Sequence, residues 1–180
     1  MSINHMNIIQ IHKNTLVNGP GMRCVIWCSG CAHNCEGCHN PETHNHKAGH
    51  PFSEDDFQEI VDQLKKPEVS GVTFSGGDPL YIFNYGHVKM LCKQLKEMFP
   101  NKTIWVYTGS TYENIEKNEI LKYIDVLVDG RFELKLATAK YRYRGSLNQR
   151  VIDVQKSLLE KEIILWEDID GWNSDQDFNK

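Results

Sequence analysis

Four cysteines stand close together in the segment CSGCAHNCEGCHN at residues 28–40. They are Cys28, Cys31, Cys35 and Cys38, and two histidines lie beside them. Thiols at this density are typical of a zinc site, a disulfide framework, a redox pair or an iron-sulfur cluster. Each alternative implies a different kind of protein, so the rest of the sequence has to distinguish between them.

The composition favours metal binding or redox chemistry over permanent disulfides. The chain has 180 residues, six cysteines and a formal net charge of -4. A chain of this length buries a core large enough to fold without disulfides. Its start, MSINHMNIIQIHKN, has no apolar run of signal-peptide length, and we expect a cytoplasmic protein in a reducing compartment. No run of about 18 apolar residues predicts a membrane span, and the net charge predicts no general attraction to nucleic acid or to membranes.

The spacing of the cysteines narrows the alternatives. Zinc ribbons use two C-x-x-C pairs about 12 to 20 residues apart, whereas only Ala32, His33 and Asn34 separate the pairs here. A zinc site could still recruit a neighbouring histidine, namely His39, His44, His46 or His50.

From Cys31 onward the pattern is C-x3-C-x2-C. Three thiolates at this spacing fit three corners of a [4Fe-4S] cluster and leave the fourth iron open to a substrate. The spacing leaves open whether Cys28 is a fourth ligand, although burial in a strand is the favoured interpretation because free cysteines are among the most buried residues.

Four short apolar segments have the pattern of β-strands. In the first of them Cys24, Ile26 and Cys28 would share one face. The four segments are MRCVIWC at 22–28, GVTFSGG at 71–77, KTIWVYTG at 102–109 and IDVLVDG at 124–130.

Helices are predicted between these strands. SEDDFQEIVDQLKKP has Ser53 as its expected N-cap, and a second helix is predicted to start with Asp78 as N-cap and Pro79 in its first turn. A third helix is predicted for TYENIEKNEILKY at 111–123. The alternation of strands and helices is typical of right-handed parallel βαβ units.

The element count predicts an α/β fold in the form of an open partial barrel, with parallel strands and helices on the outside. A complete eight-stranded barrel needs about 250 residues. We expect a single domain over residues 1–180, with a core at about 18–152, a C-terminal extension at about 153–180 and a frayed tail, WNSDQDFNK. Ligands bind at the carboxyl ends of parallel strands, which is where the cysteine loop, SGGDP, TGST and DGRF fall.

These motifs resemble a known enzyme family. C-x3-C-x2-C followed by Gly-Gly-Asp-Pro at the end of the next strand is similar to the radical S-adenosylmethionine superfamily, whose members have the same type of partial barrel. From about Asn18 to about Ile152 the ordered set of motifs resembles the family of activating enzymes for the anaerobic ribonucleoside-triphosphate reductase. That set comprises NGPGMRC, GCAHNCEGCHNPETH, SGGDPL, VYTG, LVDGRFE and RGSLNQR.

The resemblance implies that Cys31, Cys35 and Cys38 hold a [4Fe-4S] cluster and that S-adenosylmethionine chelates the fourth iron. An electron from the reduced cluster would break the S–C5′ bond, and the 5′-deoxyadenosyl radical would take a hydrogen from a glycine of the reductase large subunit. A low-potential donor, such as a reduced flavoprotein, would supply the electron. The iron and the cofactor carry this chemistry while the protein fixes the geometry, so the resemblance implies no catalytic side chain. The implied cofactor contacts are Gly37, Cys38, His39, Gly76 and Gly77.

Three positions depart from the commonest superfamily pattern. Gly37 and Asp78 replace an aromatic residue and a glutamate, a pattern typical of the activating-enzyme family itself. Ser110 stands where that family usually has a tyrosine, so no ring contact is expected there.

Two other functions compete with this interpretation. One is activation of a different glycyl-radical enzyme. The other is a zinc-bound nucleic-acid binding module, because KYRYRGSLNQR at 140–150 combines basic residues with tyrosines that could stack on bases. The remainder of the chain is acidic and contains no familiar nucleic-acid motif, so we expect neither nucleic acid nor a membrane as a partner.

Overall fold

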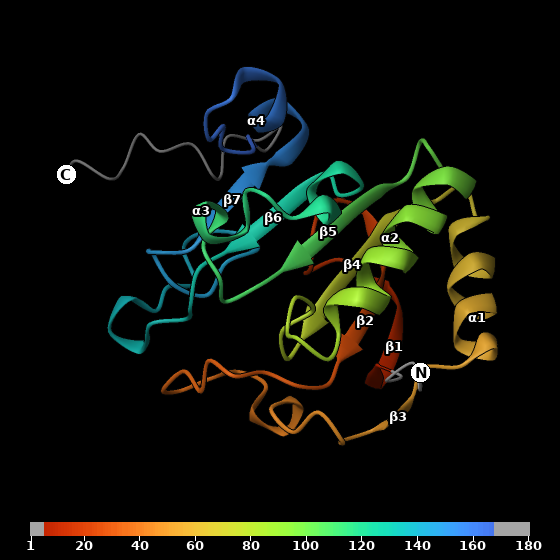
Figure 1. Ribbon diagram of the computed structural model, residues 1–180, viewed down its shortest axis with the longest axis horizontal. Coiled ribbons are helices and arrows are strands. Elements are labelled where there is room, and N and C mark those ends of the chain that lie inside the picture. The colour runs from red at the N-terminus through yellow and green to blue at the C-terminus, as the bar shows by residue number, and fades with distance from the viewer. Residues whose placement is uncertain (1–5, 168–180) are drawn as a thin grey trace.

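The computed structural model describes residues 6–167, which contain a mixed seven-stranded sheet (Figure 1). Its strand order is β3-β1-β2-β4-β5-β6-β7. The strands β2, β4, β5 and β6 are parallel to one another, and β1, β3 and β7 pair antiparallel with their neighbours. The strands are β1 (Asn7–Thr15), β2 (Met22–Cys28), β3 (His50–Pro51), β4 (Val69–Gly76), β5 (Thr103–Tyr107), β6 (Val126–Asp129) and β7 (Arg150–Asp153).

The four predicted strands are confirmed as the parallel centre of the sheet, but the prediction of parallel strands throughout is wrong. β1, β3 and β7 were not predicted, and all three are antiparallel. Only residues 16–21 connect β1 to β2. A parallel crossover needs a dozen or more residues, so a connection this short forces the antiparallel arrangement.

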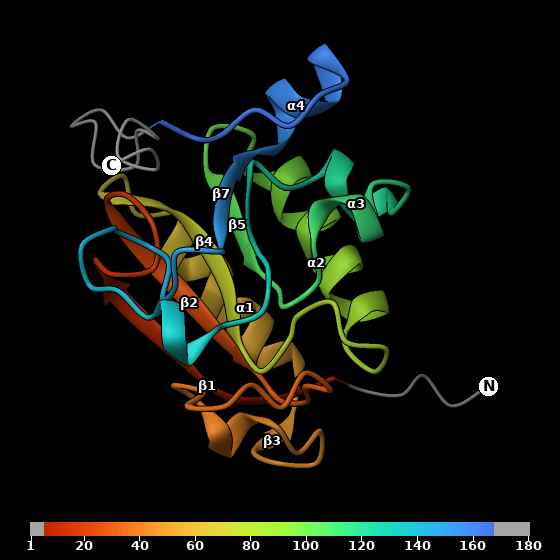
Figure 2. The same cartoon turned by 90° about the vertical axis from the view of Figure 1, so that its left-hand side faces the viewer.

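The helices are α1 (Glu54–Leu64), α2 (Tyr85–Met98), α3 (Tyr112–Ile115) and α4 (Val154–Glu160), with 3-10 turns η1 (Pro41–Thr43), η2 (Glu119–Lys122) and η3 (Leu134–Leu136). Figures 1 and 2 show α1 and α2 on one face of the sheet, while the loop before β2 and the segment after β6 lie on the other. α1 begins as predicted, because Ser53 and Asp56 form a capping box. Within the described residues, no helix is long and apolar enough to cross a membrane.

Two helix predictions need correction. Asp78 is not the N-cap of α2, which begins at Tyr85 with Asn84 as its N-cap. The Asp78 carboxylate instead accepts from Leu80 N at 2.8 Å, which forms a local turn, and it also binds groups from other segments. The helix predicted at 111–123 is two short helices, α3 and η2, which are separated at Asn118.

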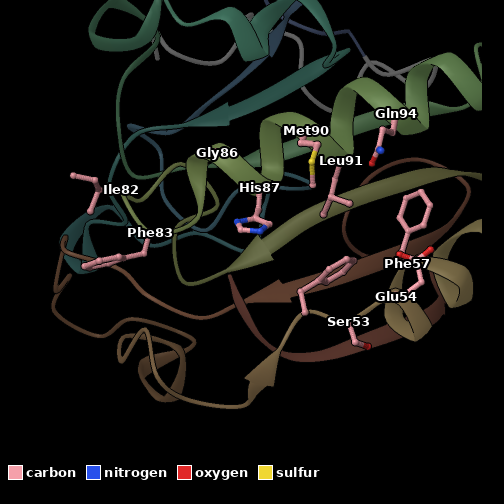
Figure 3. A pocket seen from close by; sticks show the side chains of 11 residues that line it. Ser53, Glu54, Phe57, Ile82, Phe83, Gly86, His87, Met90, Leu91 and Gln94 are labelled. Atoms are coloured by element: carbon pink, nitrogen blue, oxygen red, sulfur yellow. The ribbon is translucent and has the colours of Figure 1, made fainter. Parts of the chain in front are cut away.

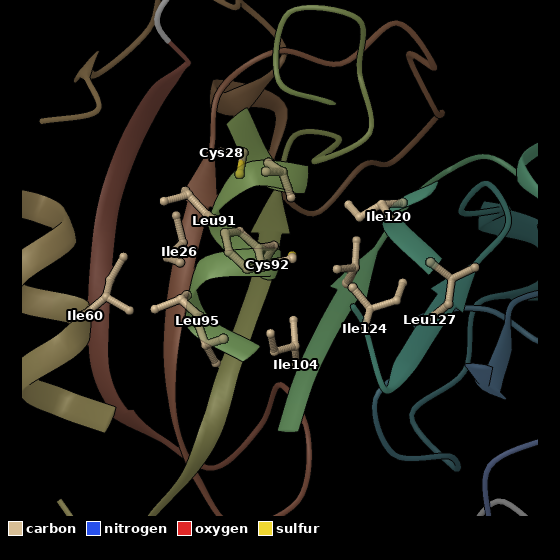
Figure 4. Close-up of a cluster of buried hydrophobic side chains, with 14 of the residues drawn as sticks. Ile26, Cys28, Ile60, Leu91, Cys92, Leu95, Ile104, Ile120, Ile124 and Leu127 are labelled. Atoms are coloured by element: carbon tan, nitrogen blue, oxygen red, sulfur yellow. The ribbon is translucent and has the colours of Figure 1, made fainter. Parts of the chain in front are cut away.

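The main core lies between α1, α2 and the sheet (Figure 4). Cys24, Ile26 and Cys28 point into it from β2, as the alternation predicted, and Leu91 and Leu95 meet them from α2. All five side chains are almost completely buried. The cysteine loop therefore leaves a strand that is fixed by the core.

The end of the described chain also packs on the sheet. Ile152 of β7 and Val154 of α4 belong to the main core, and Trp166 contacts Trp105 edge-on with ring centroids 5.0 Å apart. The predicted frayed tail at 172–180 lies outside the described residues.

Arg23 holds the amino-terminal ends of the central strands together on the face opposite α1 and α2. Its guanidinium is fully buried and donates to Thr73 Oγ1 at 2.8 Å, Val72 O at 2.7 Å and Thr103 O at 3.0 Å. Burial lowers the pKa of Arg23 to about 10. One side chain from β2 thereby satisfies acceptors on β4 and β5.

Replacing Arg23 with methionine should lower the free energy of unfolding by about 3 kcal/mol, because each buried acceptor left without its donor costs about 1–3 kcal/mol. Urea denaturation of the metal-free protein measures this loss. The control is Lys117→Met at an exposed position, which should change stability by less than about 0.5 kcal/mol. Equal effects of the two substitutions would contradict the role given to Arg23.

Candidate iron-sulfur site

A cavity of about 270 Å³ lies at the carboxyl ends of the parallel strands. It brings together six of the seven residues that the sequence predicted for the site. These are Cys31, Cys35, Cys38, His39, Gly76 and Gly77.

Gly37 is not part of the cavity lining. Its φ of 69° lies in the left-handed region that favours glycine. The residue shapes the turn that carries Cys38, and Cys38 N donates to Cys35 O at 3.2 Å within that turn. The structure thus gives Gly37 a conformational reason to be glycine.

Backbone hydrogen bonds hold the start of the cysteine loop against η1 and against the turn after β4. Gly30 N donates to Thr43 O at 2.7 Å, and Cys31 N donates to His44 O at 3.1 Å. Asp78 N donates to Gly30 O at 2.8 Å, which joins the loop to the turn after β4. The first cysteine of the motif is therefore held on two sides.

Two backbone N–H groups point at cysteine sulfurs. His33 N lies 3.4 Å from Cys31 Sγ, and Asn40 N lies 3.4 Å from Cys38 Sγ. Burial raises the pKa of the Cys31 thiol, and the His33 N–H acts in the opposite direction by stabilising the thiolate. N–H groups arranged in this way are typical of sulfurs that ligate iron, whose electronic properties they tune.

Cys28 has a different environment from the other three cysteines. Its thiol is fully buried in the main core, with Sγ 3.9 Å from Met6 Sδ, and burial raises its pKa far above the usual value. The preceding residue, Trp27, lines the cavity, so Cys28 points to the opposite face of β2. Its sulfur lies in apolar surroundings, among helix side chains (Figure 4).

Gly76 and Gly77 allow the backbone of β4 to approach the cysteine loop. A Cβ at Gly76, whose φ is 99°, would lie 2.7 Å from Cys28 O. A Cβ at Gly77 would lie 2.5 Å from Gly30 O. Sequence reasoning assigned these glycines to cofactor contact alone, whereas their geometry also requires glycine for the packing of the loop.

Asp78 is a buried carboxylate that joins three segments. His33 Nε2 lies 2.7 Å from Asp78 Oδ2, and Thr108 Oγ1 lies 3.0 Å from Asp78 Oδ1. Gly109 N donates to the same carboxylate at 3.3 Å. The side chain therefore connects the turn after β4 to the cysteine loop and to the end of β5.

The histidines near the cysteines have other neighbours. His39 lies against Phe132, with ring centroids 4.7 Å apart, and His46 stacks on Phe83 at 4.5 Å. His50 Nε2 lies 3.2 Å from Asp56 Oδ1. Within residues 6–167, no group of three or more His, Cys, Asp or Glu side chains is arranged around a single metal ion.

The donor set fits a cluster better than a mononuclear site. Three cysteines share one cavity wall, and each cysteine ligand of a [4Fe-4S] cluster binds a different iron. Cys31, Cys35 and Cys38 are the residues that would hold it. Cysteine thiolates are the characteristic ligands of such clusters.

Sequence reasoning missed several residues of the cavity wall. His33 lies within the cysteine segment and Gln149 lies within RGSLNQR. Phe132 belongs to DGRF, which follows a predicted strand. Position at a strand end was the available signal for these residues. Of the lining residues that were not named individually as site residues, Ser75, Thr108, Gly109, Gly130 and Phe132 belong to segments that were predicted at the ligand edge. The others are Asn18, Trp27, His33, Asn40, Tyr107, Gly145 and Gln149.

The basic stretch at 140–150 is largely engaged within the chain. Tyr143 contacts Trp105 edge-on at 5.2 Å, and Arg144 lies over the ring of Tyr141 at 4.3 Å. Arg150 binds Glu113 at 2.9 Å and lowers the pKa of that carboxyl to about 2. These contacts give the stretch a structural role on the open face of the sheet.

A larger cavity of about 600 Å³ lies on the helical face, between α1 and the start of α2 (Figure 3). Its wall is mainly apolar and includes Phe57, Phe83 and Met90. No cysteine lines it. Its chemistry therefore does not match the site that the sequence predicted.

Comparison with known proteins agrees with an iron-sulfur site. The sequence profile of a family described as "4Fe-4S single cluster domain" matches residues 17–152. The chain is 40% identical over 171 residues to the anaerobic ribonucleoside-triphosphate reductase-activating protein of Enterobacteria phage T4, an alignment that covers 94% of this chain and 100% of that protein. Proteins of the same name from Vibrio cholerae and Escherichia coli K12 are 38% and 37% identical, over 80% and 81% of this chain and 96% and 97% of theirs.

Each of the single substitutions Cys31→Ala, Cys35→Ala and Cys38→Ala should prevent assembly of an intact cluster, because a thiolate ligand is lost. Cys28→Ala should retain the cluster and lose only stability, since it leaves a small cavity in the core. Iron and sulfide content and visible absorbance after anaerobic reconstitution measure the difference. Loss of iron from Cys28→Ala, in a variant that remains folded, would show that the ligand set includes Cys28.

Gly77→Ala should loosen the cysteine loop, because its Cβ would collide with Gly30 O. We expect lower cluster occupancy and faster hydrogen exchange at residues 28–31 than in the parent protein. The matched control is Gly86→Ala in α2, where a Cβ meets nothing within 4 Å. This control should be neutral or slightly stabilising. Unchanged exchange at the loop in Gly77→Ala would contradict the packing role.

Proposed function

The chain belongs to the family of anaerobic ribonucleoside-triphosphate reductase-activating proteins, and from this premise we propose that it is a radical S-adenosylmethionine enzyme that installs a glycyl radical on that reductase. Cys31, Cys35 and Cys38 would hold a [4Fe-4S] cluster. When bound, the cluster would supply the electron that cleaves S-adenosylmethionine to methionine and a 5′-deoxyadenosyl radical. A low-potential donor such as a reduced flavoprotein would re-reduce it.

The observation that carries this proposal is the shared cavity. The three cysteines of C-x3-C-x2-C and the Gly-Gly turn after β4 line one space, although about 40 residues of sequence separate them. Such convergence at the carboxyl ends of parallel strands is typical of ligand sites in α/β proteins.

The residues of the chain would bind and orient rather than transfer protons. His33 N and Asn40 N stabilise negative charge on two of the sulfurs. The backbone at Gly76 and Gly77 is exposed to the same cavity and offers carbonyl groups to an ammonium group. His39, Phe132 and Gly145 lie together in the lining of the cavity, where an adenosine could lie against them.

We also interpret the fold as the open partial barrel of this superfamily, formed as one domain over the chain. The support is the parallel centre of the sheet with α1 and α2 on its outer face. A reducing, cytoplasmic setting is part of the proposal, because all six cysteines are free thiols.

The proposal is tested with anaerobically reconstituted protein and dithionite as the electron source. The protein should cleave S-adenosylmethionine to methionine and 5′-deoxyadenosine, which chromatography detects. With its cognate reductase it should produce a radical whose electron paramagnetic resonance doublet collapses when glycine is deuterated at Cα. The Cys35→Ala protein is the negative control.

The outcomes separate the alternatives. Cleavage without a radical on the reductase would indicate a different glycyl-radical enzyme or another substrate. Absence of cleavage by protein with an assembled cluster and a sufficiently strong reductant would refute the radical mechanism altogether. A colourless protein that takes up zinc instead of iron would favour the nucleic-acid binding alternative.

A further inference from the structure

His33 lies between two cysteines of the motif, and the function proposed above uses its backbone N–H but gives its side chain no role. Its side chain is largely buried, with an exposed fraction of 23%, and its ring reaches Asp78 at 2.7 Å. The ring also packs on the backbone of Gly109, where a Cβ would lie 2.4 Å from His33 Cδ2. The imidazole thus occupies the space that a side chain at position 109, just after β5, would fill.

The other hydrogen bonds of Asp78 determine which group is the donor in the contact between His33 and Asp78. Asp78 accepts from Leu80 N and Gly109 N, and the Thr108 hydroxyl donates to Asp78 Oδ1 at 3.0 Å. A carboxylate with these donors is held in its acceptor form. His33 Nε2 therefore carries a proton and donates it to Asp78 Oδ2.

The main chain of His33 acts on the cysteine motif itself. Its N–H points at Cys31 Sγ from 3.4 Å, and its carbonyl accepts from Arg131 Nη2. The residue thus touches the turn after β4 through Asp78, the turn after β5 through Gly109 and the segment after β6 through Arg131. One residue connects the cysteine loop to three successive strand ends.

We propose that His33 is a positioning residue that locks the cysteine loop on the strand ends and holds its own N–H against Cys31 Sγ, so that the His33–Asp78 contact tunes the cluster that the loop carries. Of these two roles, only the tuning of the cluster rests on the proposed function. Docking of the loop is a property of the metal-free chain. N–H donation to a ligating sulfur stabilises the more negatively charged, reduced cluster, and losing it should shift the reduction potential to more negative values.

The first experiment uses metal-free protein and therefore does not depend on the proposed function. Peptide-resolved alkylation with iodoacetamide measures how accessible Cys31, Cys35 and Cys38 are in the wild-type protein, His33→Ala and His33→Gln. Since a hydrogen bond to a charged group contributes about 1.5–3 kcal/mol, His33→Ala should accelerate alkylation of these thiols at least about tenfold. His33→Gln, whose amide can donate to Asp78, should restore much of the protection.

The matched control is His50→Ala. His50 also pairs with a carboxylate, Asp56, but its side chain is 51% exposed and lies outside the cavity. Its removal should leave the alkylation rates unchanged. Thr108→Val removes a donor to Asp78 without touching the loop and should give an intermediate rate. Equal alkylation in His33→Ala and wild-type protein would overturn the inference.

The second experiment uses reconstituted protein and redox titration followed by electron paramagnetic resonance. His33→Ala should show a more negative potential and an altered signal of the reduced cluster, with partial recovery in His33→Gln. An unchanged potential and signal would overturn the tuning role. If wild-type protein assembles no cluster, the proposed function fails, and the tuning role with it, while the alkylation result still decides the docking role.

Discussion

The Asp78 carboxylate is the interaction on which the arrangement of the site depends. A polar side chain that is only 3% exposed is costly to bury unless hydrogen-bond donors surround it. Those donors come from His33 in the cysteine loop, from Thr108 and Gly109 after β5, and from Leu80 in its own turn. Since each segment supplies part of the compensation, none can move away without leaving a buried charge poorly solvated. The requirement to satisfy one side chain thus sets the relative positions of three loops.

Close backbone contacts at three glycines complete this arrangement. Gly76, Gly77 and Gly109 let neighbouring segments approach more closely than any Cβ would allow. A loop with little regular structure between Ser29 and Asn40 is consequently bound to the sheet and its strand-end turns at Ser29, Gly30 and His33. Such rigid support matters for a metal site, because second-shell contacts determine how the ligands are oriented. The same two residues, Gly76 and Gly77, thus allow close packing of the cysteine loop and also line the cavity.

Local pattern was enough to predict some parts of the fold and not others. The strand of Met22–Cys28 and the helix that begins after Ser53 follow from alternation and capping, which are local signals. The strands at the two sides of the sheet were missed, because β7 has four residues and β1 is polar and mostly exposed over its second half. The role of Asp78 was also mispredicted. Its partners His33 and Thr108 are 45 and 30 residues away, and a rule for Asp-Pro at a helix start cannot detect them.

The size of the cavity bears on the kind of substrate that the proposed enzyme could accept. Pockets that enclose a drug-sized ligand occupy about 300–1,000 Å³, and the cavity around Cys31, Cys35 and Cys38 measures about 270 Å³. In the proposed enzyme a cluster and S-adenosylmethionine would share a space that is already smaller than the usual pocket for one drug-sized ligand, which leaves too little volume for a second such molecule beside them. The reacting group of the substrate would then enter through the mouth of the cavity, while the rest of the substrate molecule stays outside it. A glycine in the backbone of another protein meets this condition, because its Cα hydrogen can be presented on a narrow loop without a side chain.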